Sequence, residues 1–153
     1  MQKTLARAAF FAVLAILGGC AMTSPDTLDP AAVRHIELEK IQWKDNPAGT
    51  AANAPLYGDP GKPGPYAYFN KWKAGNMSRP HYHPNDRYIV VLSGTWWVGS
   101  GKKYDPDSTV PMPAGTTVIH TGKGIHYDGA KQGDAILLIH GMGPATSTPA
   151  EEK

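Results

Sequence analysis

From residue 66 onward, short runs of β-branched and aromatic residues follow one another, and glycine, proline or aspartate ends almost every run. Typical runs are RYIVVLSG (87–94), TTVIHTGKG (116–124) and AILLIHG (135–141). After residue 44, no stretch shows the 3.6-residue apolar period of an amphipathic helix. Many short strands joined by tight turns are typical of sandwiches and barrels, so we predict an all-β fold in a single domain.

The expected local structure is less regular at the start of this domain. RHIELEKIQW (34–43) alternates apolar and polar residues, which favours a first strand, with a helical turn as the alternative. Residues 44–65 are dense in proline, glycine and asparagine, and we expect a long ordered surface loop there. YAYFNKWK (66–73) has the aromatic alternation of a strand. The segment 93–95 (Ser-Gly-Thr) separates two strand-like runs and indicates a tight hairpin.

The first twenty residues form an export signal by composition. They contain a basic start, an apolar run over 8–17 and the sequence LGGC over 17–20, and the run is too short for a comfortable membrane span. LGGC resembles the lipobox of bacterial lipoproteins. This resemblance implies cleavage before Cys20, lipidation of Cys20 and, with Ala21 next, sorting to the outer membrane. An ordinary signal peptide that is cut a few residues later is the alternative.

The chain therefore divides into four parts. We predict a signal peptide over 1–19, a lipidated N-terminus and flexible tether over 20–33, a folded domain over 34–145, and a disordered tail over 146–153. The protein is then exported, as a periplasmic or outer-membrane-anchored lipoprotein that contacts the membrane through its lipid anchor only.

Charge and cysteine usage exclude two classes of function. Removal of residues 1–19 takes away Lys3 and Arg7 and leaves 13 basic and 13 acidic residues, a balance that gives no case for a nucleic-acid partner. Cys20 is the only cysteine, so the rest of the chain can form neither a disulfide nor a thiolate metal site.

Two histidines lie two residues apart, in HYH over 81–83. Side chains at this spacing on a strand share a face, so His81 and His83 could bind one cation, and neutral imidazole suits Zn, Fe, Ni and Cu. A pair of surface histidines explains this pattern equally well. His35 and His120 match no motif in the sequence, and we interpret both as structural or solvent-exposed.

The wider context of this pair resembles the first signature of the cupin family. In GNMSRPHYHPNDRYIVVLSG (75–94) the spacing is Gly, five residues, His-x-His, three residues, the position of the family's glutamate, six residues, Gly. Arg87 stands where the family has glutamate. TGKGIH (121–126) is similar to the second signature and makes His126 the third metal ligand by resemblance. Thr121, Lys123 and Ala130 depart from that signature's proline, glycine and asparagine.

Further segments carry the same resemblance, which covers about residues 41–144. They are 56–66, 91–99, 112–116 and 140–144, and together they resemble a group of small secreted bacterial cupin-domain proteins. The resemblance implies a double-stranded β-helix, also called a jelly roll, with its site inside the mouth of the barrel.

Arg87 replaces the only anionic ligand of the family and cannot itself bind a metal, because a guanidinium keeps its charge in proteins. Three outcomes stay open. Arg87 pairs with an acid such as Asp86 or Asp128 and leaves an open three-histidine site; or His140, at the end of the last strand, replaces the carboxylate; or the metal is lost and Arg87 anchors an anion. Strand alternation places Arg87 on the same face as Ile89 and Val91, which we expect to be buried. This pattern disfavours a surface position for Arg87.

We therefore expect an exported cupin whose site, formed by His81, His83 and His126, binds a divalent metal ion and a small, anionic molecule. The metal could be Zn, Fe, Mn, Ni or Cu. One function class is a metalloenzyme such as a dioxygenase or isomerase, and the other is a metal-free binding or sensing module with Arg87 as the anion anchor. A homodimer is compatible with the sequence.

Overall fold

The computed structural model describes residues 28–153. The chain divides into two units, and the second, Glu37–Lys153, contains all the strands of the described residues. The predicted signal peptide and Cys20 lie outside the described residues. Within residues 28–153, no helix is long and apolar enough to cross a membrane.

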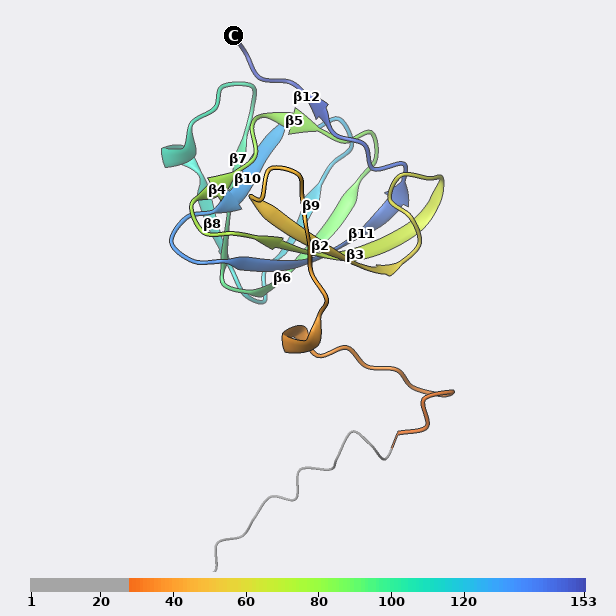
Figure 1. Cartoon of the computed structure of the whole chain (residues 1–153). Coiled ribbons are helices and arrows are strands. Elements are labelled where there is room, and N and C mark those ends of the chain that lie inside the picture. The colour runs from red at the N-terminus through yellow and green to blue at the C-terminus, as the bar shows by residue number, and fades with distance from the viewer. Residues whose placement is uncertain (1–27) are drawn as a thin grey trace, which may run out of the picture. The chain divides into compact units, whose positions relative to one another are not determined.

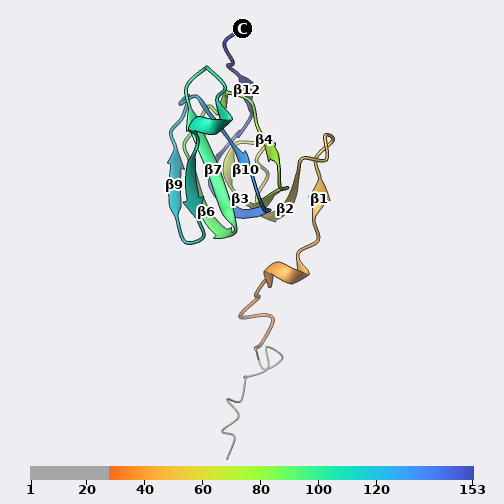
Figure 2. The ribbon, with the colours of Figure 1, turned by 90° about the vertical axis from the view of Figure 1, so that its left-hand side faces the viewer.

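The strands form two antiparallel sheets (Figures 1 and 2). The first sheet has six strands, in the order β1 (Lys44–Asp45), β2 (Ala51–Tyr57), β3 (Gly64–Trp72), β11 (Ala135–Gly143), β6 (Arg87–Ser93) and β9 (Thr117–His120). The second sheet has the order β12 (Thr148–Pro149), β5 (His81–Tyr82), β10 (His126–Ala130), β7 (Thr95–Ser100) and β8 (Val110–Pro113), and β4 (Asn76–Met77) also pairs with β10. Two short 3-10 helices, η2 (Leu38–Lys40) and η3 (Pro106–Ser108), complete the elements. The all-β prediction is confirmed.

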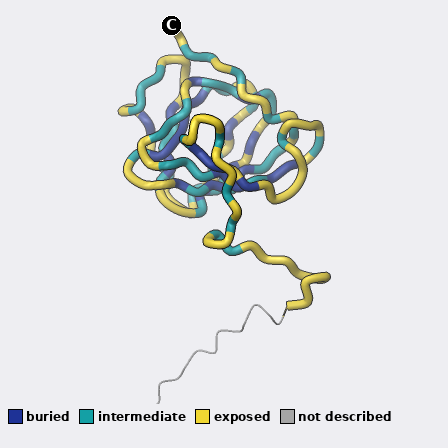
Figure 3. The backbone as a smooth tube through the Cα atoms, viewed as in Figure 1, coloured by how far each residue is buried: buried dark blue, intermediate teal, exposed yellow. Residues whose placement is uncertain are grey.

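The core lies between the two sheets, because both contribute side chains to one apolar cluster. On β6 and β11, alternate residues are buried, which is the pattern of strands with one inward face (Figure 3). The buried members of the cluster are Tyr66, Ile89, Val91, Trp96, Ala130, Ala135, Leu137 and Ile139. The same alternation turns Arg87 inward with Ile89 and Val91, as the sequence predicts.

Two expectations for residues 34–65 need correction. Residues 34–43 form no strand: the structure has the alternative, a helical turn, at η2. Residues 44–65 are more than a loop, because they contain β1, β2 and the start of β3. The small residues Ala51, Ala52 and Ala54 are buried on β2. Alanine has a weak strand propensity, so tertiary burial, which the local sequence does not show, decides this segment.

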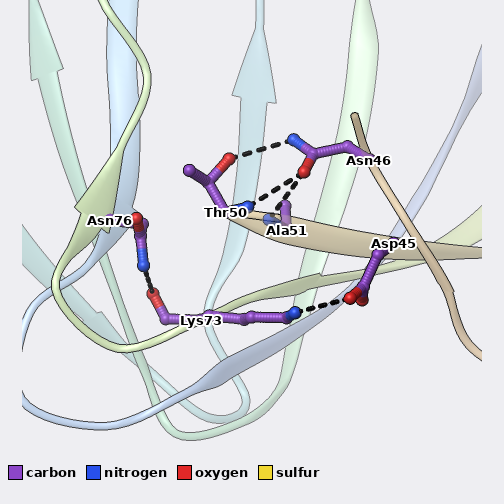
Figure 4. Close-up of polar contacts among 6 residues, drawn as sticks. All are labelled: Asp45, Asn46, Thr50, Ala51, Lys73 and Asn76. Atoms are coloured by element: carbon purple, nitrogen blue, oxygen red, sulfur yellow. Dashed lines mark hydrogen bonds and ion pairs between the residues drawn. The ribbon is translucent and has the colours of Figure 1, made fainter. Parts of the chain in front are cut away.

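A network of polar side chains begins β2 (Figure 4). The Asn46 side-chain oxygen accepts the backbone N–H of Thr50 at 2.9 Å and that of Ala51 at 3.3 Å, and the Asn46 amide donates to Thr50 Oγ1 at 2.9 Å. Lys73 Nζ forms an ion pair with Asp45 at 2.8 Å, which ties β1 to the end of β3. Asn76 donates to the Lys73 carbonyl oxygen at 3.2 Å and so fixes the next turn. Asparagine often forms turns in this way, which explains why the composition of residues 44–65 resembles that of a loop.

The segment 93–95 is not a hairpin. β6 and β7 belong to different sheets, and the chain crosses from one to the other at Gly94. Gly94 has a φ of 75°, and a Cβ there would collide with the Asp134 carbonyl oxygen. A turn in a jelly roll can therefore look like a hairpin turn in sequence while it joins strands that do not pair.

The prediction of a disordered tail over 146–153 is wrong, because Thr148–Pro149 forms β12 and pairs with β5. The composition of this segment is polar and contains proline, but the exposed edge of the second sheet supplies backbone partners for it.

Candidate metal centre and cavity

The structure brings the three predicted ligands together from two neighbouring strands. His81 on β5 lies directly opposite His126 on β10, and His83 follows β5 immediately. The ring centroids are 4.5 Å apart for His81 and His126, 4.9 Å for His81 and His83, and 5.3 Å for His83 and His126. One nitrogen from each ring lies within 4.8 Å of the other two, which is close enough for all three to bind one ion.

Each of these imidazoles has one ring nitrogen held by a main-chain carbonyl. The Nδ1 atoms of His81, His83 and His126 hydrogen-bond to the carbonyl oxygens of Arg79 (2.8 Å), Thr146 (3.0 Å) and Gly124 (2.9 Å). A carbonyl can only accept, so Nδ1 carries the proton and Nε2 keeps a free lone pair. The Nε2 atoms of His83 and His126 are buried and have no hydrogen-bond partner. Metal-binding histidines in proteins typically have this arrangement, so these residues fit a metal ion.

The buried histidines are held in the neutral form that binds metals. Burial lowers the pKa of His83 from 6.5 to about 3, and the positive charge of Arg87 contributes to this shift. Burial also lowers the pKa of His126, although the Asp128 carboxylate acts in the opposite direction. At neutral pH both rings therefore offer a lone pair without first losing a proton.

Two further residues belong to this site, and our sequence reasoning missed both as ligand candidates. His120 on β9 and Asp128 on β10 form, with His126, a second cluster of potential ligand atoms within 4.8 Å of one another. All three are buried, and the rings of His120 and His126 are only 3.7 Å apart. Strand alternation in the sequence could have indicated an inward position for His120, because Val118 and His120 share a face of the strand.

Arg87 argues against His120 as a metal ligand. Its Nη2 atom lies 3.4 Å from His120 Nδ1, and a guanidinium can only donate. His120 Nδ1 therefore accepts, and the ring proton sits on Nε2, which leaves no lone pair there for a metal. The first cluster, His81, His83 and His126, is consequently the better metal site.

Arg87 has no acidic partner. Its side chain is only 7% exposed, yet no carboxylate of the described residues lies within salt-bridge distance of it, and its Nε atom has no hydrogen-bond partner. Asp86 instead accepts the N–H of Gly122 at 2.7 Å, and Asp128 lies 4.0 Å from His126 Nε2. The expected pairing of Arg87 with Asp86 or Asp128 is therefore absent, and a buried cation is left for another anion to neutralise.

His140 does not take part in the site. It shares a face with Ile136 and Leu138, as the alternation predicts, but this is the outer face of the first sheet. Its ring stacks on that of Tyr88, with centroids 5.3 Å apart, and it lines a separate surface cavity. The prediction that His140 replaces the family's carboxylate is wrong, because Leu137 and Ile139 occupy the inward positions of this strand.

A cavity of about 350 Å³ opens beside the histidines. Aromatic and apolar side chains form much of its wall, and Arg87, Tyr68 and Asp128 contribute polar groups. Burial raises the pKa of Tyr68, against the influence of the Arg87 charge, so its phenol keeps its proton at neutral pH and can donate. The remaining lining residues are Asn70, Trp72, Ser78, Arg79, Pro80, His81, His83, Trp96, Leu137, Ile139, Ser147 and Pro149. A cavity that combines aromatic and apolar walls with convergent polar groups is typical of small-molecule sites.

The turn before β10 links two of the ligands. Lys123 stands where the cupin signature has glycine, and it adopts a φ of 64°, the left-handed conformation that glycine takes freely. Its N–H donates to the His83 carbonyl oxygen at 2.7 Å, and the next carbonyl, of Gly124, holds His126. The departure from the signature at Lys123 thus leaves the turn conformation intact, at a strain of roughly 1 kcal/mol.

The metal-free protein is expected to lose stability as the pH falls below 6.5. Burial first, then the neighbouring His126 and Arg87, lower the pKa of His120 from 6.5 to about 2. Between these two pH values the unfolded chain binds a proton on His120 and the folded chain does not. The free energy of unfolding therefore keeps its full value above pH 6.5 and falls as the pH decreases below it. Each such histidine contributes about 1.4 kcal/mol per pH unit to the slope. Urea unfolding between pH 6 and 4.5 measures this slope, and His120→Leu should reduce it by about that amount. A His120→Leu slope equal to that of the parent would contradict the assignment.

No family model matches the sequence, and no curated protein matches it either. Solved structures do resemble the fold. The polyketide cyclase RemF from Streptomyces resistomycificus superposes with a TM-score of 0.61 at 13% identity, over 79% of this chain and 87% of RemF. A conserved protein with a double-stranded β-helix domain from Klebsiella pneumoniae gives 0.58 at 16% identity, over 78% of this chain and 99% of that one. A cupin-like protein from Thermotoga maritima gives 0.54 at 17% identity, over 71% and 80%.

At such low identities the likeness concerns the fold alone, and it agrees with the two antiparallel sheets described above. The chain therefore has a double-stranded β-helix fold, which is the fold that its resemblance to the cupin signatures implies.

Proposed function

We propose that this protein binds one divalent metal ion through the Nε2 atoms of His81, His83 and His126 and holds a small anionic molecule beside it through Arg87. One observation carries the metal part of the proposal: all three imidazoles tie Nδ1 to a main-chain carbonyl and leave Nε2 free within one small volume. A histidine-only set accepts Zn, Fe, Mn, Ni or Cu, so the donor atoms do not select one metal.

The anionic part of the proposal rests on Arg87. A buried guanidinium without a carboxylate partner is electrostatically unfavourable until an anion enters. Its planar fork matches a carboxylate through two parallel hydrogen bonds, and it lines the cavity, so a carboxylate is the ligand class that fits best.

The other cavity residues would complete the binding of such a molecule. Tyr68 donates a hydrogen bond from its protonated phenol, and Trp72 and Trp96 provide apolar walls that exclude water. Asp128 places a carboxylate in the same cavity, where it could accept a proton from the bound molecule. When bound, a divalent ion supplies Lewis-acid chemistry that polarises an oxygen atom of the small molecule.

The reaction class is a further part of the proposal. RemF is a polyketide cyclase and thus an enzyme with a small-molecule substrate, which is the class of partner that we propose here. A metal-dependent dioxygenase or isomerase would use the same parts. The second candidate is a metal-free binding or sensing module. The absence of a carboxylate partner for Arg87 among the described residues favours it, because the guanidinium alone can anchor the anion. Association into a homodimer stays a prediction.

Ligand titrations with matched probes test the anionic part. Benzoate and benzamide have nearly the same shape, but only benzoate carries a charge. Benzoate should bind the zinc-loaded protein at least tenfold more tightly than benzamide, because only the carboxylate neutralises Arg87. Isothermal titration calorimetry measures both affinities. Equal affinities for the two probes would contradict the proposal that Arg87 selects anions.

We also propose that the chain is exported and anchored by a lipid on Cys20, which lies outside the described residues. The LGGC sequence at 17–20 supports this proposal. Cys20→Ser should move the protein from the membrane fraction to the soluble fraction, because the modified thiol is lost. Fractionation with immunoblotting measures this, with Thr23→Ala as a control that should stay in the membrane fraction. A Cys20→Ser protein that stays membrane-bound would contradict the anchor.

A further inference from the structure

The C-terminal residues lie against β5, which carries His81 and ends directly before His83. β12 pairs with β5 so that Pro149 lies opposite His81 and Thr148 opposite Tyr82 (Figure 1). The pairing continues beyond β12, since the N–H of Ala150 donates to the Pro80 carbonyl oxygen at 2.9 Å. We refer to residues 145–151 as the C-terminal strap.

One of the three imidazoles depends on this strap for its orientation. His81 and His126 hydrogen-bond to carbonyls only two residues before them in the sequence. His83 instead hydrogen-bonds to the carbonyl of Thr146, which is 63 residues away along the chain, at 3.0 Å. The strap therefore fixes both the tautomer and the ring orientation of His83.

The strap also forms part of the cavity wall. Ser147 and Pro149 line the cavity together with His81, His83 and Arg87. Thr146, Ser147 and Pro149 of the strap are exposed. The strap therefore forms this part of the cavity wall with few buried side chains.

Contacts at both ends hold the strap in place. At its start, the Ala145 N–H donates to the Pro60 carbonyl oxygen at 2.6 Å. At its end, the Glu151 carboxylate forms a two-pronged ion pair with Arg79, with Nε to Oε2 at 2.8 Å. The Arg79 guanidinium also lies over the Tyr104 ring, 3.8 Å from its centroid. The ion pair between Glu151 and Arg79 is solvent-exposed and therefore weak, so the end of the strap belongs to the parts of the fold that can open locally.

We propose that the C-terminal strap completes the metal centre: the Thr146 carbonyl positions His83 for the ion, and the strap closes one wall of the cavity. This inference rests on the proposed metal site. Because the contact is reciprocal, the strap strengthens metal binding, and metal binding in turn reduces local opening of the strap.

Two truncated chains test the positioning role. A chain that ends at Ala145 lacks Thr146 and β12, whereas a chain that ends at Glu151 keeps both. Loss of a hydrogen-bond partner behind a metal-binding histidine typically weakens metal binding by about 10- to 100-fold. We expect this loss in the zinc affinity of the chain that ends at Ala145, measured by competition with a chelator. The chain that ends at Glu151 should stay within about twofold of the full-length chain.

Hydrogen exchange on the full-length chain tests the reverse effect without any truncation. Zinc should slow exchange of the Ala150 amide by at least about tenfold, because this amide pairs with Pro80 only while the strap is closed. The Lys40 amide, which bonds to Glu37 away from the strap, is the internal control and should not change. Equal exchange of Ala150 with and without zinc would contradict the coupling, even if the truncated chain fails to fold.

The outcomes separate the two proposals. A full-length chain that binds no zinc contradicts the metal centre itself, and the strap proposal falls with it. A full-length chain that binds zinc, together with a chain ending at Ala145 that binds equally well, contradicts the strap proposal alone.

Discussion

Replacement of His126 by alanine is expected to weaken zinc binding by about 60- to 700-fold. The His126 ring lies 4.5 Å from that of His81 and 5.3 Å from that of His83, centroid to centroid, and its buried Nε2 atom has no hydrogen-bond partner. Apparent binding free energies of zinc sites with four ligands are about 10–16 kcal/mol, so one ligand is worth about 2.5–4 kcal/mol. Each 1.4 kcal/mol corresponds to a tenfold change in affinity, which gives the expected loss.

His140→Ala is the matched control for this prediction. It removes a histidine of the same chain, but one that lies on the outer face of the first sheet and stacks on Tyr88. Zinc affinity, measured by chelator competition, should stay unchanged in this variant. Because His126 is buried, His126→Gln provides a second test that keeps a polar side chain of similar length. If both His126 variants fold, as shown by circular dichroism, and bind zinc like the parent, the proposed ligand set is wrong.

Replacement of Arg87 is expected to have the opposite effect on metal affinity. Arg87 stands at the position where the cupin signature has glutamate, and its charge already lowers the pKa of His83. At roughly 5 Å and an effective dielectric constant of 20, two unit charges repel by about 3 kcal/mol. Removal of this repulsion in Arg87→Gln should tighten zinc binding by about 10- to 100-fold, and Arg87→Glu should tighten it further by adding a carboxylate ligand.

The same substitutions should abolish the preference for benzoate over benzamide, because the anion loses its guanidinium partner. The two measurements together distinguish a local effect of charge from a general loss of structure, since zinc binding improves while benzoate binding disappears. An Arg87→Glu protein with unchanged zinc affinity would show that Arg87 does not limit metal binding.

Local patterns in the sequence were sufficient to predict the architecture and three members of the site. The all-β fold follows from short runs of β-formers. The spacing from Gly75 to Gly94 predicts His81 and His83 on one strand, and in the structure β5 holds His81 and ends directly before His83. Alternation along β6 predicts the inward direction of Arg87, because that strand has one buried face.

Other features depend on long-range pairing, which alternation alone cannot show. His140 and Ile139 lie on opposite faces of β11, and only the packing of the two sheets shows which face is inward. His120 reaches the site because β9 pairs with β6, so that His120 lies opposite Arg87. The tail is ordered because β5 offers an edge at which Thr148–Pro149 can pair. Each of these features needs a partner that is distant in the sequence.

Metal content of the full-length chain, purified without a histidine tag, tests the central claim most directly. The protein would be reconstituted separately with Zn, Fe, Mn, Ni and Cu, dialysed, and analysed by inductively coupled plasma mass spectrometry. The three ligand nitrogens of His81, His83 and His126, which lie within 4.8 Å of one another, predict one ion per chain for at least one of these metals, and less than a tenth of that amount in His126→Ala. A parent chain that retains none of the five metals would contradict the proposal of a metal centre.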